Sequence, residues 1–259
     1  MDEEFLLSTP TAQKLYHDFA EQCRFWITIA ISIRKRLQKM SVLKILPRYG
    51  WAEIITNGDR CVQTVWMSTI SQVMRLHGKN FQKWAETLEK AVGNPLFHWS
   101  HLELKRYFGY HGVLNGETAE EVWNLCNQKL QEPSMSVRNL IRRSGVTLIC
   151  TTDDPADSLY WHKELAADDS FEVQVLPAWR PDKAMNIEKP DYAEYLKKLG
   201  QAARCQIETF ADLKMALKKR MDAFEEMGCR ASDHALEYVM YVPETEENLE
   251  KIFAKRKTG

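Results

Sequence analysis

The chain has 259 residues, of which 44% are hydrophobic and 10% are aromatic, and its 35 basic residues nearly balance 36 acidic ones. This composition allows a sizeable buried core, in one large domain or two small ones. A formal net charge of −1 gives no basic footprint along the whole chain, so we expect neither nucleic acid nor a membrane as a partner.

No run of about eighteen apolar residues is present, and the acidic start Met1-Asp2-Glu3-Glu4 lacks the basic and apolar regions of a signal peptide. We therefore expect a cytoplasmic protein. The six cysteines are scattered without a CxxC pair, which predicts reduced thiols rather than disulfides. They are Cys23, Cys61, Cys126, Cys150, Cys205 and Cys229.

The first 143 residues carry the signals of helices. Thr9-Pro10 is typical of a helix start, Gly93-Asn94-Pro95 of a helix stop, and Thr118-Ala119-Glu120-Glu121 has the spacing of a capping box. Apolar residues at helical spacing complete the pattern. We expect helices over residues 11–22, 81–91, 97–108, 118–130 and 136–143.

The pattern changes at residue 146, where short apolar runs begin to alternate with helical segments. We expect strands over 146–150, 171–176 and 229–232, and helices over 158–167 and 211–227, with Gly228 ending the second helix. Further helices are expected to the end of the chain. Strands and helices alternating in this way predict a parallel sheet with a functional site at the carboxyl ends of its strands.

The segment Thr151-Thr152-Asp153-Asp154-Pro155-Ala156-Asp157-Ser158 places carboxylates and hydroxyls directly after the first of these strands. Asp153 and Asp154 could hold sugar hydroxyls or move a proton there, and we take them as the catalytic candidates. The structural alternative is a helix cap, in which Asp157 or Ser158 accepts the first free N–H groups.

The segment Trp179-Arg180-Pro181-Asp182-Lys183 follows the next predicted strand. The planar guanidinium of Arg180 matches a carboxylate such as that of a uronic acid, and Trp179 could cover the face of a sugar. Trp179, Arg180 and Asp182 are therefore candidates for substrate binding. The alternative is an ion pair between Arg180 and Asp182, with Trp179 in the core.

Two further motifs are weaker. His98 and His101 stand three residues apart on one predicted helix, which allows metal ligation but equally a structural or solvated pair. Ser232-Asp233-His234 resembles part of a catalytic triad, but no G-x-S-x-G nucleophile elbow accompanies it, so we do not expect a hydrolase.

Seven motifs in order give the chain a resemblance to the uronate isomerases of the amidohydrolase superfamily, over residues 5–23 and 81–259. They are Phe5-Leu6-Leu7, Leu15-Tyr16-His17-Asp18, Gly93-Asn94-Pro95-Leu96-Phe97-His98-Trp99, His101-Leu102-Glu103-Leu104, Thr151-Thr152-Asp153-Asp154-Pro155, Val175-Leu176-Pro177-Ala178-Trp179-Arg180-Pro181-Asp182-Lys183 and Ser232-Asp233-His234-Ala235.

The resemblance implies an α/β fold of the (β/α)8 TIM-barrel type with helical insertions. It also implies an aldose–ketose isomerase that converts D-glucuronate to D-fructuronate and D-galacturonate to D-tagaturonate. A proton moves from C2 to C1 through a cis-enediol, and a divalent metal ion, expected to be zinc, supports the reaction. Because relatives are nearly twice as long, residues 1–259 are expected to form the amino-terminal portion of an incomplete barrel, truncated after residue 259.

Residues 24–80 do not fit the resemblance. Relatives carry Asp-Tyr-His-x-His on the first barrel strand, whereas this chain has Thr28, Ile29 and Ala30 at the corresponding place, so we expect the metal site to be lost. The same segment holds ten basic residues against two acidic ones. Synonymous codons for residues 24–32, read two bases on, give Ile-Leu-Asp-Tyr-His-Cys-His-Ile. We therefore expect a reading-frame shift across residues 24–80.

The leading interpretation is thus a uronate isomerase by ancestry that binds uronic acids in its intact family and is inactive as this chain. The alternative is a non-catalytic helical interaction protein whose basic segment 24–80 binds an acidic partner. Salt-sensitive binding of the chain to nucleic acid or anionic lipid would support the interaction protein over the isomerase. Nothing in the sequence specifies the oligomeric state.

Overall fold

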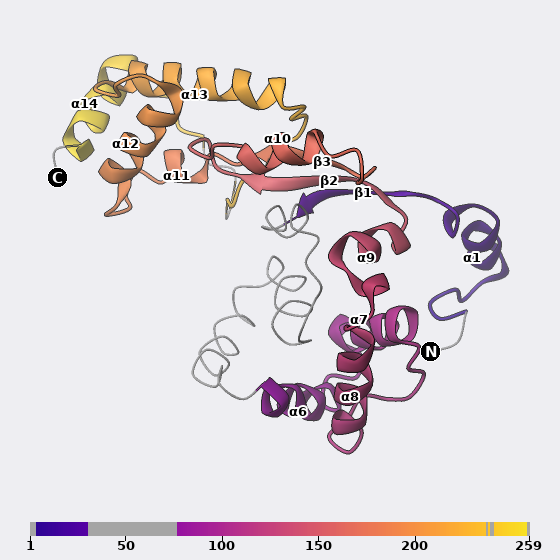
Figure 1. Cartoon of the computed structure of the whole chain (residues 1–259). Helices are drawn as coiled ribbons and strands as arrows, with labels where there is room; N and C mark the ends of the chain where they lie inside the picture. The colour runs from indigo at the N-terminus through magenta and orange to yellow at the C-terminus, as the bar shows by residue number, and fades with distance from the viewer. Residues whose placement is uncertain (1–3, 31–76, 237, 239–240, 258–259) are drawn as a thin grey trace. The chain divides into compact units, whose positions relative to one another are not determined.

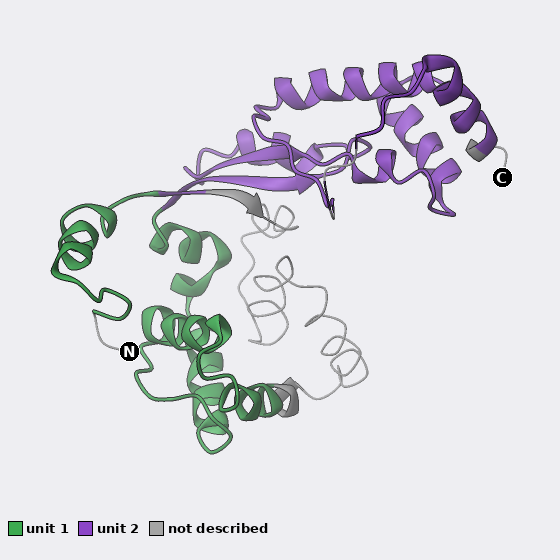
Figure 2. Cartoon of the chain, turned by 180° about the vertical axis from the view of Figure 1, so that it is seen from behind, with its two compact units in different colours: residues 1–24, 40–145 green, residues 25–39, 146–259 purple. Residues whose placement is uncertain are grey.

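The computed structural model describes residues 4–30, 77–236, 238 and 241–257, and the chain divides into two compact units (Figure 1, Figure 2). Unit 1 comprises residues 1–24 and 40–145, and unit 2 comprises residues 25–39 and 146–259.

Unit 1 is helical throughout its described part, as predicted. Its elements are α1 (Pro10–Leu15), the π-helical turn η1 (Tyr16–Ala20), α6 (His77–Leu88), α7 (Pro95–Glu103), the π-helical turn η2 (Leu104–Phe108), α8 (Ala119–Lys129), the 3₁₀ turn η3 (Pro133–Met135) and α9 (Val137–Arg143). Leu88, Leu104 and Val122 meet in its core and are almost completely buried. Burial of these apolar faces holds the short helices together.

Unit 2 is built on a parallel three-stranded sheet in the order β1-β2-β3. The strands are β1 (Phe25–Ala30), β2 (Val146–Asp153) and β3 (Gln174–Trp179). An isolated parallel bridge joins Trp179 to Ser232, where a third strand was predicted. The prediction of an α/β fold with a parallel sheet is confirmed, and these strands do not by themselves form a closed barrel.

Strand boundaries differ from those predicted, and the difference places the site residues. β2 continues to Asp153, so Thr151 and Asp153 belong to the sheet rather than to a loop. β3 ends at Trp179, which is therefore a strand residue as well. Both strands extend because their backbone groups pair across the sheet as far as the register Asp153↔Trp179.

The helices of unit 2 are α10 (Tyr160–Ala166), α11 (Asp182–Met185), α12 (Tyr192–Ala203), α13 (Phe210–Glu226) and α14 (Glu246–Lys257). The long predicted helix is α13, and Gly228 follows its end with φ +84°, a conformation that favours glycine. The sequence analysis missed α12, although its buried Tyr192, Leu196 and Leu199 have helical spacing.

The predicted capping box at Thr118 is wrong. The Thr118 hydroxyl instead donates to the Val113 carbonyl (2.7 Å) and accepts the Asn115 N–H (3.0 Å). A complete capping box lies at the start of α13, where the Thr209 side chain accepts the Asp212 N–H and the Asp212 carboxylate accepts the Thr209 N–H. The preceding loop decides which threonine is available for capping.

Two general predictions can also be compared with the structure. Among the described residues, no helix is long and apolar enough to cross a bilayer. Cys23, Cys126, Cys150, Cys205 and Cys229 are free thiols, and Cys61 lies outside the described residues. The reduced state of the cysteines stays a prediction.

Candidate functional site

Six titratable side chains follow the carboxyl ends of β2, β3 and the Ser232 bridge in unit 2. We call this group the strand-end cluster. It consists of Asp154, Arg180, Asp182, Lys183, Asp233 and His234. Its ion pairs form two sets, Lys183 with Asp154 and Arg180 with Asp182 and Asp233, at the edge of the sheet where parallel α/β folds place their ligands.

Backbone hydrogen bonds align the three segments that carry the cluster. The Arg180 N–H donates to the Asp153 carbonyl (2.9 Å), which fixes the end of β3 against the end of β2. The Asp233 N–H donates to the Trp179 carbonyl (3.0 Å), which fixes the next segment against β3. The parallel register therefore brings residues 53 positions apart in sequence, Arg180 and Asp233, to one place.

Arg180 forms ion pairs with two carboxylates. Its Nη2 lies 2.7 Å from Asp233 Oδ2, and its Nε lies 3.5 Å from Asp182 Oδ2. The side chain is 26% exposed, so the guanidinium is held in place yet reaches solvent. The predicted pair between Arg180 and Asp182 is confirmed. Asp233 was not counted among the predicted site residues, although the Ser232-Asp233-His234 motif was named and the position after the third predicted strand lies at the same edge.

Asp182 connects the loop after β3 to the segment after the Ser232 bridge. Both of its carboxylate oxygens lie 3.2 Å from the Ala235 N–H, which donates to them. His234 Nδ1 lies 3.8 Å from Asp182 Oδ1. Asp182 therefore organises the cluster through backbone and side chain together.

Asp154 is the most protected carboxyl group of the cluster. Its Oδ1 accepts the Ala156 N–H (2.9 Å), and its Oδ2 lies 3.7 Å from Lys183 Nζ. Burial raises its pKa despite these favourable contacts, because desolvation disfavours the charged form. The phenol of Tyr195, another residue that the sequence analysis missed, is buried beside it, and burial raises the pKa of that phenol as well.

The helix-cap alternative for this segment is observed only in part, because the cap residue of α10 is Leu159, which makes no side-chain cap hydrogen bond. Asp157 Oδ2 accepts the Asp154 N–H (3.2 Å), and Ser158 Oγ accepts the Tyr160 N–H (3.3 Å) at the start of α10. Asp157 and Ser158 therefore shape the turn that presents Asp154. The two interpretations are compatible because different residues carry them.

Asp153 lies in a different environment from its neighbour Asp154. Its side chain is 0% exposed, and its Oδ2 accepts the hydroxyl hydrogen of Thr151 at 2.6 Å. The imidazole of His162, a residue that the sequence analysis did not identify, also lies within this buried group. The two adjacent acids thus face an interior and a partly open environment.

Trp179 belongs to the core of unit 2. It is 8% exposed, and its ring meets that of Phe224 edge to face with centroids 5.0 Å apart. Leu159 completes this apolar contact. The geometry matches the core alternative and leaves little of the indole available to cover a sugar.

The two histidines of α7 do not form a metal site. His101 Nδ1 lies 2.6 Å from the Phe97 carbonyl, and its Nε2 accepts the Leu114 N–H at 2.9 Å, so both ring nitrogens serve the backbone. His98 packs against the Phe5 ring at 4.9 Å. Across residues 4–30, 77–236, 238 and 241–257, no three His, Cys, Asp or Glu side chains are placed to hold a metal ion.

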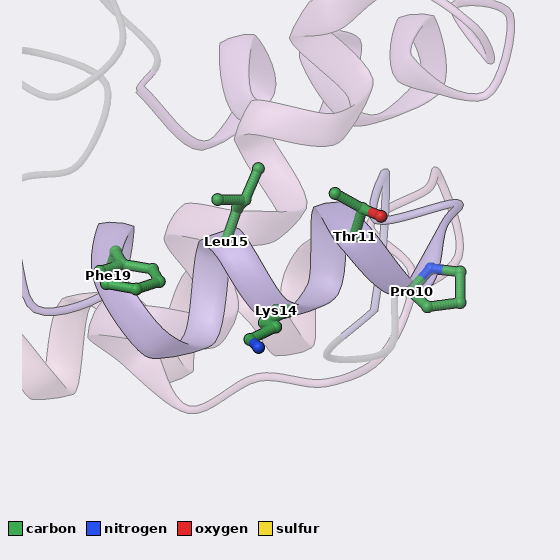
Figure 3. Close-up of a pocket in the computed structure, with 5 residues that line it drawn as sticks. All are labelled: Pro10, Thr11, Lys14, Leu15 and Phe19. Atoms are coloured by element: carbon green, nitrogen blue, oxygen red, sulfur yellow. The ribbon is translucent and has the colours of Figure 1, made fainter.

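A shallow pocket of about 280 Å³ lies in unit 1, on the continuous helix formed by α1 and η1 (Figure 3). Pro10, Thr11, Lys14, Leu15 and Phe19 line it. Lys14 is its single charged side chain, and none of the predicted site residues contributes to it. This pocket therefore shares no residue with the strand-end cluster.

Most of the predicted frame-shifted segment, residues 31–76, lies outside the described residues. Its described beginning forms β1, which pairs with β2 through Phe25↔Val146 and Ala30↔Thr151. Thr28, Ile29 and Ala30 therefore lie on the strand beside β2. None of these three residue types offers the imidazole ligands that the resemblance implies for this strand.

Comparison with known proteins places this chain beside one group of sugar-acid isomerases. A family model described as glucuronate isomerase matches residues 71–259. The uronate isomerases of Lachnospira eligens, Lachnoclostridium phytofermentans and Endomicrobium trichonymphae are 57%, 52% and 47% identical to it. Each alignment covers 100% of this chain and 55%, 56% and 55% of the relative, respectively.

Solved structures give the same result for the fold. A crystal structure of uronate isomerase from Thermotoga maritima matches with a TM-score of 0.86 at 30% identity, covering 100% of this chain and 56% of that one. Glucuronate isomerase from Caulobacter crescentus matches with a TM-score of 0.83 at 15% identity and the same coverage, which shows the fold alone. The chain spans about half the length of the relatives that it matches.

Proposed function

Because this chain belongs to the uronate isomerase family, we propose that its strand-end cluster is the substrate-binding half of a uronate isomerase site. The observation that carries the proposal is the placement of Arg180 between two carboxylates at the carboxyl edge of a parallel sheet. The reaction is the conversion of D-glucuronate to D-fructuronate and of D-galacturonate to D-tagaturonate.

The sheet of unit 2 represents the first part of a (β/α)8 barrel in this proposal. Support comes from its parallel order, from the helices between its strands and from the TM-score of 0.86 to a relative nearly twice as long. A (β/α)8 barrel closes only when its eight strands are all present. The remaining strands would come from sequence equivalent to the other half of the relatives.

Arg180 is assigned to the carboxylate of the uronic acid. A guanidinium can form two parallel hydrogen bonds with a carboxylate, and partial burial strengthens such a charged contact. Asp182 and Asp233 hold the group in one orientation, and Lys183 supplies a second, largely exposed cation beside Asp154. Bound substrate would compete with the two aspartates for part of the guanidinium.

Asp154 is assigned to proton transfer. Isomerisation removes the proton from C2, forms a cis-enediol and returns a proton to C1, which requires a group able to accept and then release a proton. The raised pKa of Asp154 brings the carboxyl closer to that task than an exposed aspartate. Asp153, which is buried, and Trp179, which lies in the core, are assigned to supporting the cluster rather than contacting the sugar.

The residues present do not fit the divalent metal ion that the family resemblance implies. His101 has both nitrogens bound to backbone groups, and β1 carries Thr28, Ile29 and Ala30 where paired histidines are expected. We therefore assign no metal ligand and no metal-dependent step to this chain. The lack of this ligand pair, together with its length of about half that of the relatives, is why we expect no turnover from the chain alone.

The experiment measures activity and binding separately. Purified chain is assayed with D-glucuronate, with and without added zinc or manganese, and no isomerisation is expected. Binding of D-glucuronate is then followed by amide chemical shifts in wild type, Arg180→Met and the exposed control Arg204→Met.

We expect Arg180→Met to weaken binding at least about tenfold and Arg204→Met to leave it within about twofold. Turnover by the wild-type chain would overturn the proposed inactivity. Uronate binding that does not depend on Arg180, or no uronate binding at all, would overturn the proposed binding site.

A further inference from the structure

Three polar side chains form a buried group inside unit 2, beneath the strand-end cluster. Thr151 and Asp153 are 0% exposed on β2, and His162 is 1% exposed on α10. Thr151 Oγ1 lies 2.6 Å from Asp153 Oδ2 and 2.7 Å from His162 Nε2. His162 Nε2 also lies 3.6 Å from Asp153 Oδ2.

The hydrogen-bond inventory fixes a direction for this group. A threonine hydroxyl has one hydrogen to donate, and its oxygen can accept a hydrogen from a second partner. Thr151 Oγ1 donates to Asp153 Oδ2 at 2.6 Å, a much shorter contact than the 3.4 Å to the Leu176 carbonyl oxygen. Thr151 Oγ1 is then left to accept from His162 Nε2–H at 2.7 Å. The result is a relay from imidazole to hydroxyl to carboxylate, with the proton of His162 on Nε2.

The relay leads to the candidate site through the backbone of Asp153. The Asp153 carbonyl accepts the Arg180 N–H at 2.9 Å, and the next residue along the chain is Asp154. We infer that Thr151 and His162 are positioning residues, which orient Asp153 and through its backbone hold Asp154 and Arg180 in the strand-end cluster. The functional consequence rests on the proposed uronate site.

Burial alone does not account for this group. Removing a hydroxyl, an imidazole and a carboxylate from water carries a desolvation cost that apolar side chains of similar volume avoid. The polar group restricts the orientation of its side chains. Hydrogen bonds of 2.6 and 2.7 Å fix the orientation of Thr151, Asp153 and His162 more tightly than apolar contacts would. The register of β2 and β3 ends at Asp153↔Trp179, where this restraint acts.

The first measurement uses the wild-type chain. Long-range ¹H–¹⁵N NMR spectra of the His162 ring report which nitrogen carries a hydrogen. We expect a protonated Nε2 whose hydrogen exchanges slowly with solvent. A ring with an unprotonated Nε2 would overturn the relay, and this result does not depend on the stability of any variant.

The second measurement uses matched variants of the whole chain. Thr151→Val keeps the branched shape and removes the hydroxyl, whereas Thr151→Ser keeps the hydroxyl. His162→Gln can still donate an N–H, and His162→Phe cannot. The readouts are the amide chemical shifts and hydrogen-exchange rates of Asp154 and Arg180, with the amide of Leu199 on α12 as an internal reference.

We expect Thr151→Val and His162→Phe to shift both amides and to speed exchange at Arg180 by at least about tenfold, since a tenfold change corresponds to about 1.4 kcal/mol. Thr151→Ser and His162→Gln should stay within about threefold of wild type. Folded Thr151→Val protein with unchanged Asp154 and Arg180 amides would overturn the inference. If Thr151→Val and His162→Phe do not fold, the conservative variants carry the test. The inference is then overturned if Thr151→Ser and His162→Gln change the chemical shifts and exchange rates of the Asp154 and Arg180 amides.

Titration with D-glucuronate then separates this inference from the proposed function. If wild type binds uronate, we expect Thr151→Val to weaken binding at least about tenfold and Thr151→Ser to restore it. Equal affinity of Thr151→Val and wild type would overturn the positioning role. If wild type binds no uronate, the proposed function fails while the tautomer and the amide measurements still test the relay.

Discussion

The guanidinium of Arg220 on α13 is bound to the backbone of Asp157, with Nη2 2.8 Å from the Asp157 carbonyl oxygen. Its Nε donates to the Pro155 carbonyl at 2.7 Å, and its Nη1 lies 3.4 Å from the Ala202 carbonyl. The Arg220 side chain thus connects the turn that carries Asp154 with helices α12 and α13. Neutral carbonyls bound by a charged donor form comparatively strong hydrogen bonds.

Removing the guanidinium of Arg220 should destabilise the turn at residues 154–158. Arg220→Met is expected to lower the free energy of unfolding by about 2–3 kcal/mol, because three buried or partly buried carbonyls lose their donor. Arg220→Lys should fall between Met and wild type, since one ammonium cannot span the three positions. Urea unfolding of the whole chain gives the free energies, and hydrogen exchange at residues 154–158 localises the change.

The control for this comparison is the neighbouring Lys219→Met, whose side chain is exposed. It should change the free energy of unfolding by less than about 0.5 kcal/mol. Equal changes in the free energy of unfolding for Arg220→Met and Lys219→Met would show that the hydrogen bonds of Arg220 do not stabilise the chain.

Glu103 should make the stability of unit 1 depend on pH. Burial raises the pKa of Glu103 to about 7, against 4.5 for the ordinary group. Between those values the folded chain keeps a proton that the unfolded chain has released, so the free energy of unfolding falls as pH rises and levels off above about 7. The fall amounts to at most about 3.4 kcal/mol, since the pKa rises by about 2.5 and each pKa unit corresponds to about 1.36 kcal/mol.

Glu103→Gln should remove this fall and stabilise the chain at pH 8, while the exposed Glu121→Gln should keep the wild-type dependence. Urea unfolding at pH 5, 6, 7 and 8 measures both. If the free energy of unfolding depends on pH in the same way for wild type and Glu103→Gln, the titrating group is not Glu103.

His101 should behave as a structural residue and not as a metal ligand. His101→Phe leaves the Leu114 N–H without its acceptor, which is expected to lower the free energy of unfolding by about 2 kcal/mol. His111→Phe, at an exposed position, is the control. Neither zinc nor EDTA should move the thermal unfolding midpoint through this residue, and a zinc stabilisation that His101→Phe abolishes would refute this.

The coding sequence should contain a shifted frame across residues 24–80. The family model matches from residue 71 onward, whereas the alignments with the three relatives cover the whole chain, so only the gene can test the shift. Sequencing the gene should give codons for Arg24 to Ser32 that read Asp-Tyr-His-x-His two bases on. Codons that do not yield this motif would eliminate the frame-shift hypothesis. A frame-restored protein that carries the motif should bind zinc more tightly than the present chain, which isothermal titration with zinc would measure.

Local signals in the sequence located most of the described secondary structure. Gly228 ended α13 as expected, because its left-handed backbone favours glycine. Capping was harder to predict, since Thr118 has the right spacing but its hydroxyl bonds to the preceding loop. Strand ends were also uncertain, because pairing across the sheet rather than residue type carried β2 to Asp153.

The sequence by itself determined the family, the alternation of strands and helices in unit 2 and the edge of the sheet at which Asp154 and Arg180 would lie. Periodicity and residue order encode these features, because each depends on neighbours close along the chain. Only the tertiary structure decided that Asp233 pairs with Arg180 and that Asp153 is buried with His162. Those relationships depend on strand register and helix packing, which join residues far apart in sequence and set the solvent exposure of each carboxylate.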